Sequence, residues 1–194
     1  MRKQINQVYQ FKITLIGSKP PIWRKITVPG NYRFWDLHVA IQDAMGWEDC
    51  HLHMFTMYSL RTKRSVQIGI PEANEYLKST GEFIRDFFSL QNPAATYVYD
   101  FGDDWRHKLT LEKVTPEKED VVYPFCSGGK NACPPEDCGG LPGYYGYLDV
   151  LSHPESEAYQ DVLEWLGEDF DPEEFEPEDV EFDDPHERQK LSGL

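Results

Sequence analysis

Apolar and polar residues alternate along two early segments of the chain, a pattern typical of strands that bury one face. The first segment is 8–16 and the second is 22–28, with a turn rich in Gly and Pro at 17–21 between them. The two segments therefore predict a hairpin. The side chains that share the buried face of the first strand are expected to be Tyr9, Phe11, Ile13 and Leu15.

The period changes in the next segment, where apolar residues of 34–45 recur at helical spacing. Gly46 follows at the position where a left-handed C-cap is expected. Two short strands, 53–59 and 65–70, come after the helix. This order predicts an α+β fold in which a helix lies across a mainly antiparallel sheet, arranged as a roll with a β-grasp-like start.

The segment 97–114 is the clearest hairpin, with its turn at Gly102. Alternation along its second strand places four side chains on one face, so we expect His107 to lie in the core or at its edge. These four are Trp105, His107, Leu109 and Leu111.

The composition shifts to Gly, Pro and Cys over 123–143, which predicts a loop followed by two helices. The second helix is expected to begin near Pro154, to be capped by Gly167, and to pack against the sheet or the first helix. A further helix start is predicted at 171–174. The apolar stripe of the second helix comprises Ala158, Val162, Trp165 and Leu166.

A chain of 194 residues is long enough to bury one core without a disulfide or a metal, so a single domain over 1–194 is expected. Its 14% aromatic content excludes a disordered chain. We find no membrane-length apolar run and no secretory signal at the start, which favours the cytoplasm, where the four cysteines stay reduced.

The formal net charge of −15 is concentrated in one part of the sequence. Residues 155–187 contain 16 Asp and Glu and no Lys or Arg, whereas residues 1–64 contain ten Lys and Arg and four acids. Either the acidic, helical C-terminal segment, 168–194, docks on the basic part, or each part faces a different partner.

Several ordered motifs are spread over about residues 5 to 180. They are Pro21-Ile22-Trp23-Arg24, the stretch 34–47 with His51-Leu52-His53-Met54-Phe55, the run from Tyr99 to His107, the run from Ala132 to Gly140, Gly143-Tyr144, and the run from Trp165 to Phe175. Together these motifs resemble the plasmid pRiA4b ORF-3-like family. The resemblance implies an α+β fold and an association with mobile DNA, but no established activity.

Acidic side chains and an imidazole gather in the 97–114 hairpin. Asp100, Asp103 and His107, with Asp104 beside them, supply the oxygen and nitrogen ligands that divalent cations bind, or groups for acid–base catalysis. Glu136 and Asp137, between rigid prolines and flexible glycines, are further catalytic candidates. The alternative is ordinary turn chemistry, a buried histidine and a covering loop.

Two other groups are candidates for zinc or another divalent cation. Thiols are zinc ligands, but the spacing of Cys126, Cys133 and Cys138 differs from that of common zinc motifs. His51 and His53 would point the same way on a strand and could share one ion. Small buried thiols and core or sheet-edge histidines are the alternatives.

Aromatic and basic residues are interleaved in the first third of the chain, as on surfaces that bind single-stranded nucleic acid. The alternative is a solvated basic face paired with the acidic segment. The leading hypothesis is a non-enzymatic binding or accessory module with a protein or nucleic-acid partner, and the second is a metal-dependent hydrolase or nuclease, so enzymatic activity stays open. The candidate nucleic-acid residues are Trp23, Arg24, Lys25, Arg61, Lys63 and Arg64.

Overall fold

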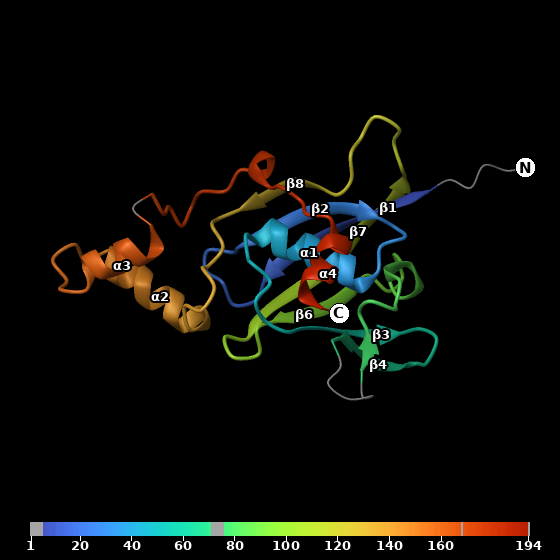
Figure 1. Cartoon of the computed structure of the whole chain (residues 1–194), viewed down its shortest axis with the longest axis horizontal. Helices are drawn as coiled ribbons and strands as arrows, with labels where there is room; N and C mark the ends of the chain where they lie inside the picture. The colour runs from blue at the N-terminus through green and yellow to red at the C-terminus, as the bar shows by residue number, and fades with distance from the viewer. Residues whose placement is uncertain (1–5, 71–75, 168, 194) are drawn as a thin grey trace, which may run out of the picture.

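In the described part of the chain, the protein is built around an eight-stranded sheet in the order β5-β4-β3-β6-β7-β1-β2-β8 (Figure 1). The structure is a computed structural model that describes residues 6–70, 76–167 and 169–193. Neighbouring strands are antiparallel except β4 and β5, which are parallel. The predicted α+β class with a mainly antiparallel sheet is confirmed.

The strands are β1 (Gln7–Leu15), β2 (Trp23–Pro29), β3 (His53–Ser59), β4 (Arg64–Gly69), β5 (Leu77–Lys78), β6 (Ala94–Tyr99), β7 (Trp105–Pro116) and β8 (Phe125–Lys130). The α-helices are α1 (Phe34–Met45), α2 (Gly140–Leu151), α3 (Tyr159–Leu166) and α4 (Pro185–Ser192). Two short 3₁₀ helices are η1 (Ile84–Asp86) and η2 (Pro177–Asp179).

The first hairpin forms as the alternation predicted. β1 pairs with β2, and Phe11 stands opposite Ile26 in the register. The odd-numbered side chains of β1, from Tyr9 to Leu15, are buried, because they face the main hydrophobic core.

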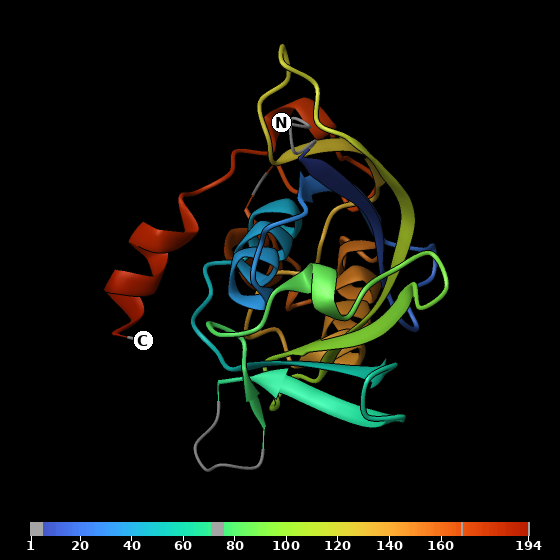
Figure 2. The same cartoon turned by 90° about the vertical axis from the view of Figure 1, so that its right-hand side faces the viewer.

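Helix α1 lies in the hollow of the curved sheet, with α4 on its other side (Figure 2). The backbone N–H of Arg33 donates to the carboxylate of Asp36 at the start of α1, and Gly46 ends the helix with a φ of 84°. All residues of α1 except Asp43 are buried, because the sheet covers one face and the C-terminal segment covers the other. The Trp35 indole N–H donates to the Pro185 carbonyl oxygen at 2.8 Å across this second contact.

The hairpin of β6 and β7 also matches its prediction. Tyr97 stands opposite His107, and the side chains of Trp105, His107 and Leu109 are buried on the same face. The sequence pattern thus placed His107 correctly in the core.

Two predictions near the second half of the chain differ from the structure. Strand β8 occupies part of the predicted loop and pairs with β2. The sequence did not predict this strand, because its Gly-rich segment shows no alternation of apolar and polar residues. Helix α3 packs on α2 through the rings of Tyr147 and Trp165, whose centroids are 4.8 Å apart. Its stripe is only partly buried, since Val162 is buried but Trp165 is 46% exposed.

The segment after α3 runs along the edge of the sheet without forming the helix expected at 171–174. The Asp171 carboxylate accepts from the Glu173 N–H and makes a local turn, which replaces the helix start. Further along, the ring of Phe175 lies under the Arg24 guanidinium, and the Pro172 carbonyl accepts from the Ala132 N–H. In the described part of the chain, every helix is too short or too polar to cross a bilayer.

Candidate functional site

Three segments that are far apart in sequence meet at one end of the sheet. They are the connection between α1 and β3, the turn between β6 and β7, and the loop that leads into α2. His51 Nε2 lies 3.1 Å from Asp137 Oδ1 and 3.7 Å from Asp100 Oδ2. Their candidate ligand atoms all lie within 4.8 Å of one another, so the structure brings together one imidazole and two carboxylates.

The turn between β6 and β7 fixes the orientation of Asp100. This residue has a φ of 52°, a left-handed conformation that Asp tolerates better than most residues. Its Oδ1 accepts from the Gly102 N–H at 2.8 Å, and its carbonyl accepts from the Asp104 N–H at 2.7 Å. One carboxylate oxygen therefore holds the turn, and the other remains to face His51.

Glu136 anchors the loop that carries Asp137. Its Oε2 accepts from the Glu48 N–H at 2.8 Å, and its Oε1 accepts a short hydrogen bond from the Tyr99 hydroxyl. Burial and this hydrogen bond to Glu136 raise the pKa of Tyr99, so the phenol stays protonated as the donor. Because both oxygens of Glu136 are engaged, it positions the loop while the neighbouring Asp137 reaches the cluster.

Asp103 joins the hairpin turn to the same loop. Its Oδ2 accepts from the Gly139 N–H at 3.1 Å. A Cβ on Gly140 would lie 2.6 Å from the Asp103 carbonyl oxygen, and Gly140 has a φ of 68°, so this approach requires glycine. The Asp103 side chain therefore braces two loops and is not part of the cluster.

The other two candidate histidines are buried away from the cluster. Burial lowers the pKa of His107 to about 3, so it stays neutral in the core. His53 is the first residue of β3, and its ring stacks on His38 at 3.6 Å. The expected pairing of His51 with His53 does not occur, because His51 precedes the strand and the two-residue alternation does not extend to it.

The three late cysteines are not gathered into one cluster. Among the described residues, the groups with metal-ligand geometry include none of Cys126, Cys133 and Cys138. Burial raises the pKa of Cys133 to about 12 and that of Cys138 to about 11, which keeps both thiols protonated. Cys133 instead contacts the sulfur of Met45 at 3.8 Å.

The candidate nucleic-acid residues fall into separate places. Arg24 is 2% exposed, and its guanidinium donates to the carbonyls of Ala44, Trp23, Lys130 and Asn131. Trp23 and Lys25 stay on the outer side of β2, where Lys12 lies over the Trp23 ring and Lys25 pairs with Glu112. The remaining three are at the tip of the β3–β4 hairpin, separated from β2 by three strands, and are Arg61, Lys63 and Arg64.

Two apolar side chains beside the cluster were not singled out by the sequence. Leu52 is 37% exposed and Phe101 is 52% exposed, and the Asp100 N–H donates to the Leu52 carbonyl between them. We call these two residues the apolar rim. The sequence did contain a signal for Phe101, because an aromatic residue in the polar turn Asp100-Phe101-Gly102 is expected to be exposed.

Comparison with known proteins places the chain in a family. The sequence profile described as plasmid pRiA4b ORF-3-like protein matches residues 7–179, which include the whole cluster. The chain belongs to this family. The uncharacterized protein y4hQ of Sinorhizobium fredii (strain NBRC 101917 / NGR234) is 33% identical over 168 residues, which cover 84% of this chain and 82% of the relative.

A solved structure shows the same fold. The crystal structure of MM3350, a protein of unknown function from Methanosarcina mazei Go1, is 48% identical in sequence and superposes with a TM-score of 0.88. The match covers 92% of this chain and 100% of MM3350. The named relatives of this pRiA4b ORF-3-like chain carry no assigned function, so function is argued from the site.

One imidazole nitrogen and two carboxylate oxygens form a ligand set that suits several divalent ions. Zinc, manganese and iron all accept this mixture, and three protein ligands leave coordination positions open. His51 is half-buried, Asp100 is buried and Asp137 is exposed, so the cluster is accessible from solvent. The arrangement can hold a cation and present it to a second molecule.

Proposed function

We propose that this pRiA4b ORF-3-like protein is a non-enzymatic binding module that holds a divalent cation at His51, Asp100 and Asp137. The observation that carries the proposal is the convergence of these three side chains from separate segments. Glu136 and Asp103 support it, because their hydrogen bonds fix the two loops that bring the carboxylates together.

A protein partner fits this site better than a small substrate. The open coordination positions of the cation are available to a carboxylate or imidazole of the partner. The apolar rim, Leu52 and Phe101, provides the exposed aliphatic and aromatic surface that interface centres use. The cation then acts as a bridge, and the rim adds contact area around it.

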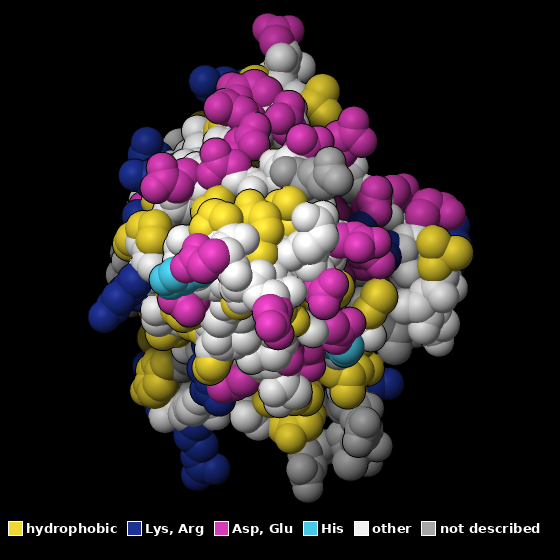
Figure 3. Space-filling model, turned by 90° about the vertical axis from the view of Figure 1, so that its left-hand side faces the viewer, with side chains coloured by type: hydrophobic (Ala, Val, Ile, Leu, Met, Phe, Trp, Pro, Cys, Tyr) yellow, Lys and Arg dark blue, Asp and Glu magenta, His cyan; other side chains and the backbone are white. Residues whose placement is uncertain are grey.

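A nucleic-acid partner and a nuclease are less well supported. Figure 3 shows Asp and Glu side chains spread over the face at the α2 and α3 end of the molecule, which would repel phosphates. Arg24 is buried, so it cannot contact a nucleic-acid backbone. His107 and Asp103, two of the expected catalytic groups, are a buried core residue and a loop brace.

The organisation of the chain is part of the same proposal. Residues 1–194 would form one unit, a roll with a β-grasp-like start, in which the acidic segment 168–194 is docked and partly helical, in the cytoplasm. Support comes from Phe170, Val180 and Phe182, which pack against the core. The link to mobile DNA that the family resemblance implies would then describe where the module is used.

Metal analysis of protein purified without chelator tests the proposal. We expect about one equivalent of a divalent ion per chain, and titration calorimetry with zinc and manganese should show binding to protein stripped of metal. Asp137→Asn should weaken binding by about tenfold or more, since a carboxylate ligand becomes a neutral amide. Asp120→Asn, an exposed position in the β7–β8 loop, is the matched control and should bind as the wild type does.

Two outcomes would contradict the proposal in different ways. Wild-type protein that binds neither ion, or Asp137→Asn protein with unchanged affinity, removes the cation site. Metal-dependent hydrolysis of bis(p-nitrophenyl) phosphate that is lost in Asp137→Asn protein but kept in Asp120→Asn protein would replace the binding module with a hydrolase.

A further inference from the structure

A cavity lies at the opposite end of β1 from the His51 cluster. β1 runs from Gln7, beside the cavity, to Leu15, which pairs with His107 near the hairpin turn. The cavity has a volume of about 360 Å³, within the range of small-molecule sites. Its walls come from β1, the β2–α1 turn, η1 and the end of β7, so four segments of the fold build it.

Backbone contacts hold these walls in place. The Gly30 N–H donates to the Gln7 carbonyl at 2.7 Å, and the Glu117 N–H donates to the Asn6 carbonyl at 2.9 Å. A Cβ on Gly30 would lie 2.5 Å from the ring of Tyr9 and 2.8 Å from the Gln7 carbonyl oxygen. Glycine at position 30 therefore lets the β2–α1 turn lie directly against Tyr9, which sets the floor of the cavity.

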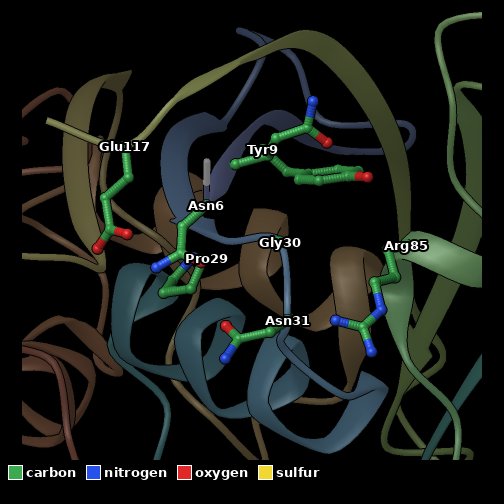
Figure 4. A pocket seen from close by; sticks show the side chains of 8 residues that line it. Asn6, Tyr9, Pro29, Gly30, Asn31, Arg85 and Glu117 are labelled. Atoms are coloured by element: carbon green, nitrogen blue, oxygen red, sulfur yellow. The ribbon is translucent and has the colours of Figure 1, made fainter. Parts of the chain in front are cut away.

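The polar groups of the cavity are separated by charge. Figure 4 shows the Arg85 guanidinium and the Tyr9 hydroxyl on one side and the Glu117 carboxylate on the opposite side. The side-chain amides of Asn6 and Asn31 lie between them. A cationic wall and an anionic wall thus face the same space.

These groups are not used by the protein itself. In the described part of the chain, neither the Arg85 guanidinium nor the Glu117 carboxylate has an ion-pair or hydrogen-bond partner, although Arg85 lies over the Phe83 ring at 4.6 Å. The Tyr9 hydroxyl also has no hydrogen-bond partner there, although its residue is only 6% exposed. Burial raises the pKa of Tyr9, and the nearby Arg85 charge offsets part of that rise.

We propose that this cavity binds a small zwitterion of the amino-acid or dipeptide class. Its carboxylate would pair with the planar guanidinium of Arg85 and accept from the Tyr9 hydroxyl. Its ammonium would pair with Glu117, and the amides of Asn6 and Asn31 would bond its remaining polar atoms. A zwitterion also suits the chain's net charge of −15, which repels a dianion over long range but not a neutral molecule.

Titration calorimetry with defined probes tests the charge pattern. The zwitterions are glycine, glycylglycine and 5-aminopentanoate, and the singly charged controls are pentanoate and pentylamine. At millimolar concentrations we expect at least one zwitterion to bind more tightly than both controls. Arg85→Gln should lower the affinity for that zwitterion by about tenfold or more. Glu117→Gln should also lower the affinity for the zwitterion, but should leave the affinity for pentanoate unchanged.

Arg61→Gln is the matched control, because Arg61 is an exposed arginine on the distant β3–β4 hairpin. The Arg61→Gln protein should bind the zwitterion with the same affinity as the wild type. Thermal melts of each variant show whether it is folded. The proposal is overturned if no zwitterion binds the wild type, if Arg85→Gln protein binds as the wild type does, or if pentanoate binds as tightly as the zwitterions.

Discussion

The guanidinium carbon of Arg24 lies 3.6 Å from the centroid of the Phe175 ring, although 151 positions separate them (175 − 24). Arg24 has no carboxylate partner in the described structure and is satisfied by backbone carbonyls, so the ring covers a buried cation. Phe175→Ala should lower the free energy of unfolding by about 2 kcal/mol, through lost apolar burial and lost cation–π attraction. Urea denaturation measures this change.

The control for that variant is Phe101→Ala, which makes the same substitution at a half-exposed turn position. Its unfolding free energy should stay within about 0.5 kcal/mol of the wild type. Equal losses in the two variants would show that the contact with Arg24 contributes nothing specific.

Two glycines of α2 should respond in opposite ways to alanine. A Cβ on Gly143 would lie 1.8 Å from the Cys138 carbonyl oxygen, whereas a Cβ on Gly146 meets nothing within 4 Å. Gly143→Ala must displace the loop that carries Asp137, so we expect a loss of about 2 kcal/mol or more and weaker cation binding. Gly146→Ala should gain about 0.5 to 1 kcal/mol from helix propensity. Thermal melts and metal titrations of both variants provide the comparison.

The contact between α4 and α1 depends on an ion pair. Arg188 Nη2 lies 2.9 Å from Asp43 Oδ1, and the partial burial of Asp43 raises its pKa to about 6. Arg188→Met leaves this carboxylate without its cation, so stability at pH 7 should fall by about 2 kcal/mol.

The deficit of the Arg188→Met variant should shrink as the pH falls from 7, because the Arg188 charge lowers the pKa of Asp43 and its removal raises that pKa above about 6. The folded variant therefore takes up a proton on Asp43 at a higher pH than the folded wild type does, while both unfolded chains take it up near pH 4. Denaturation at pH 7 and pH 5 measures the effect, and the double variant with Asp43→Asn should lose this pH dependence. If the loss of unfolding free energy in the Arg188→Met variant is the same at pH 7 and pH 5, the ion pair of Arg188 with Asp43 is not its cause.

His107 should make the protein less stable in acid. Its pKa is about 3 in the folded state because of burial, and the ordinary value of 6.5 applies to the unfolded state. The stabilisation is therefore present above pH 6.5 and is lost as the pH falls, because only the unfolded chain binds the proton. Between pH 7 and pH 5 the loss from this residue is about 2 kcal/mol.

His107→Gln protein should lack that part of the pH dependence, since glutamine does not titrate. The other buried histidines are present in both proteins, so the difference between their denaturation curves at pH 7 and pH 5 isolates His107. Identical pH dependence in the two proteins would mean that residue 107 is protonated in the folded state as well.

Local patterns predicted the parts of the fold that rest on local physics. Alternation located β1 and the buried face of β7, and Gly46 marked the end of α1 because a left-handed cap favours glycine. Strand β8 was not predicted, because its pairing with β2 is long-range and its own sequence shows no alternation of apolar and polar residues. The C-terminal segment 168–194 was expected to be helical, but its pattern placed a helix start at 171–174 and not at α4, because the docking of α4 depends on contacts such as that of Arg188 with Asp43.

The sequence predicted the individual residues of the site but not which of them lie together. Asp100, Asp137 and His51 were all candidates, yet only the folded chain shows that these three meet and that Asp103 and Glu136 serve as braces. The cavity beside Arg85 carried no local signal, because its residues come from four separate segments and each is ordinary in its own context.

The docking of the segment near Pro172 also bears on how the protein stays dispersed. β8 is the last strand of the sheet, and the chain after α3 lies along it, with Phe175 against Gly129. An uncovered edge strand is a template on which another chain can add a strand, and glycine offers no side chain to obstruct it. Removing the acidic segment would therefore expose the unpaired edge of β8. It would also remove many of the negative charges that make copies of the protein repel one another, so the shortened protein should self-associate.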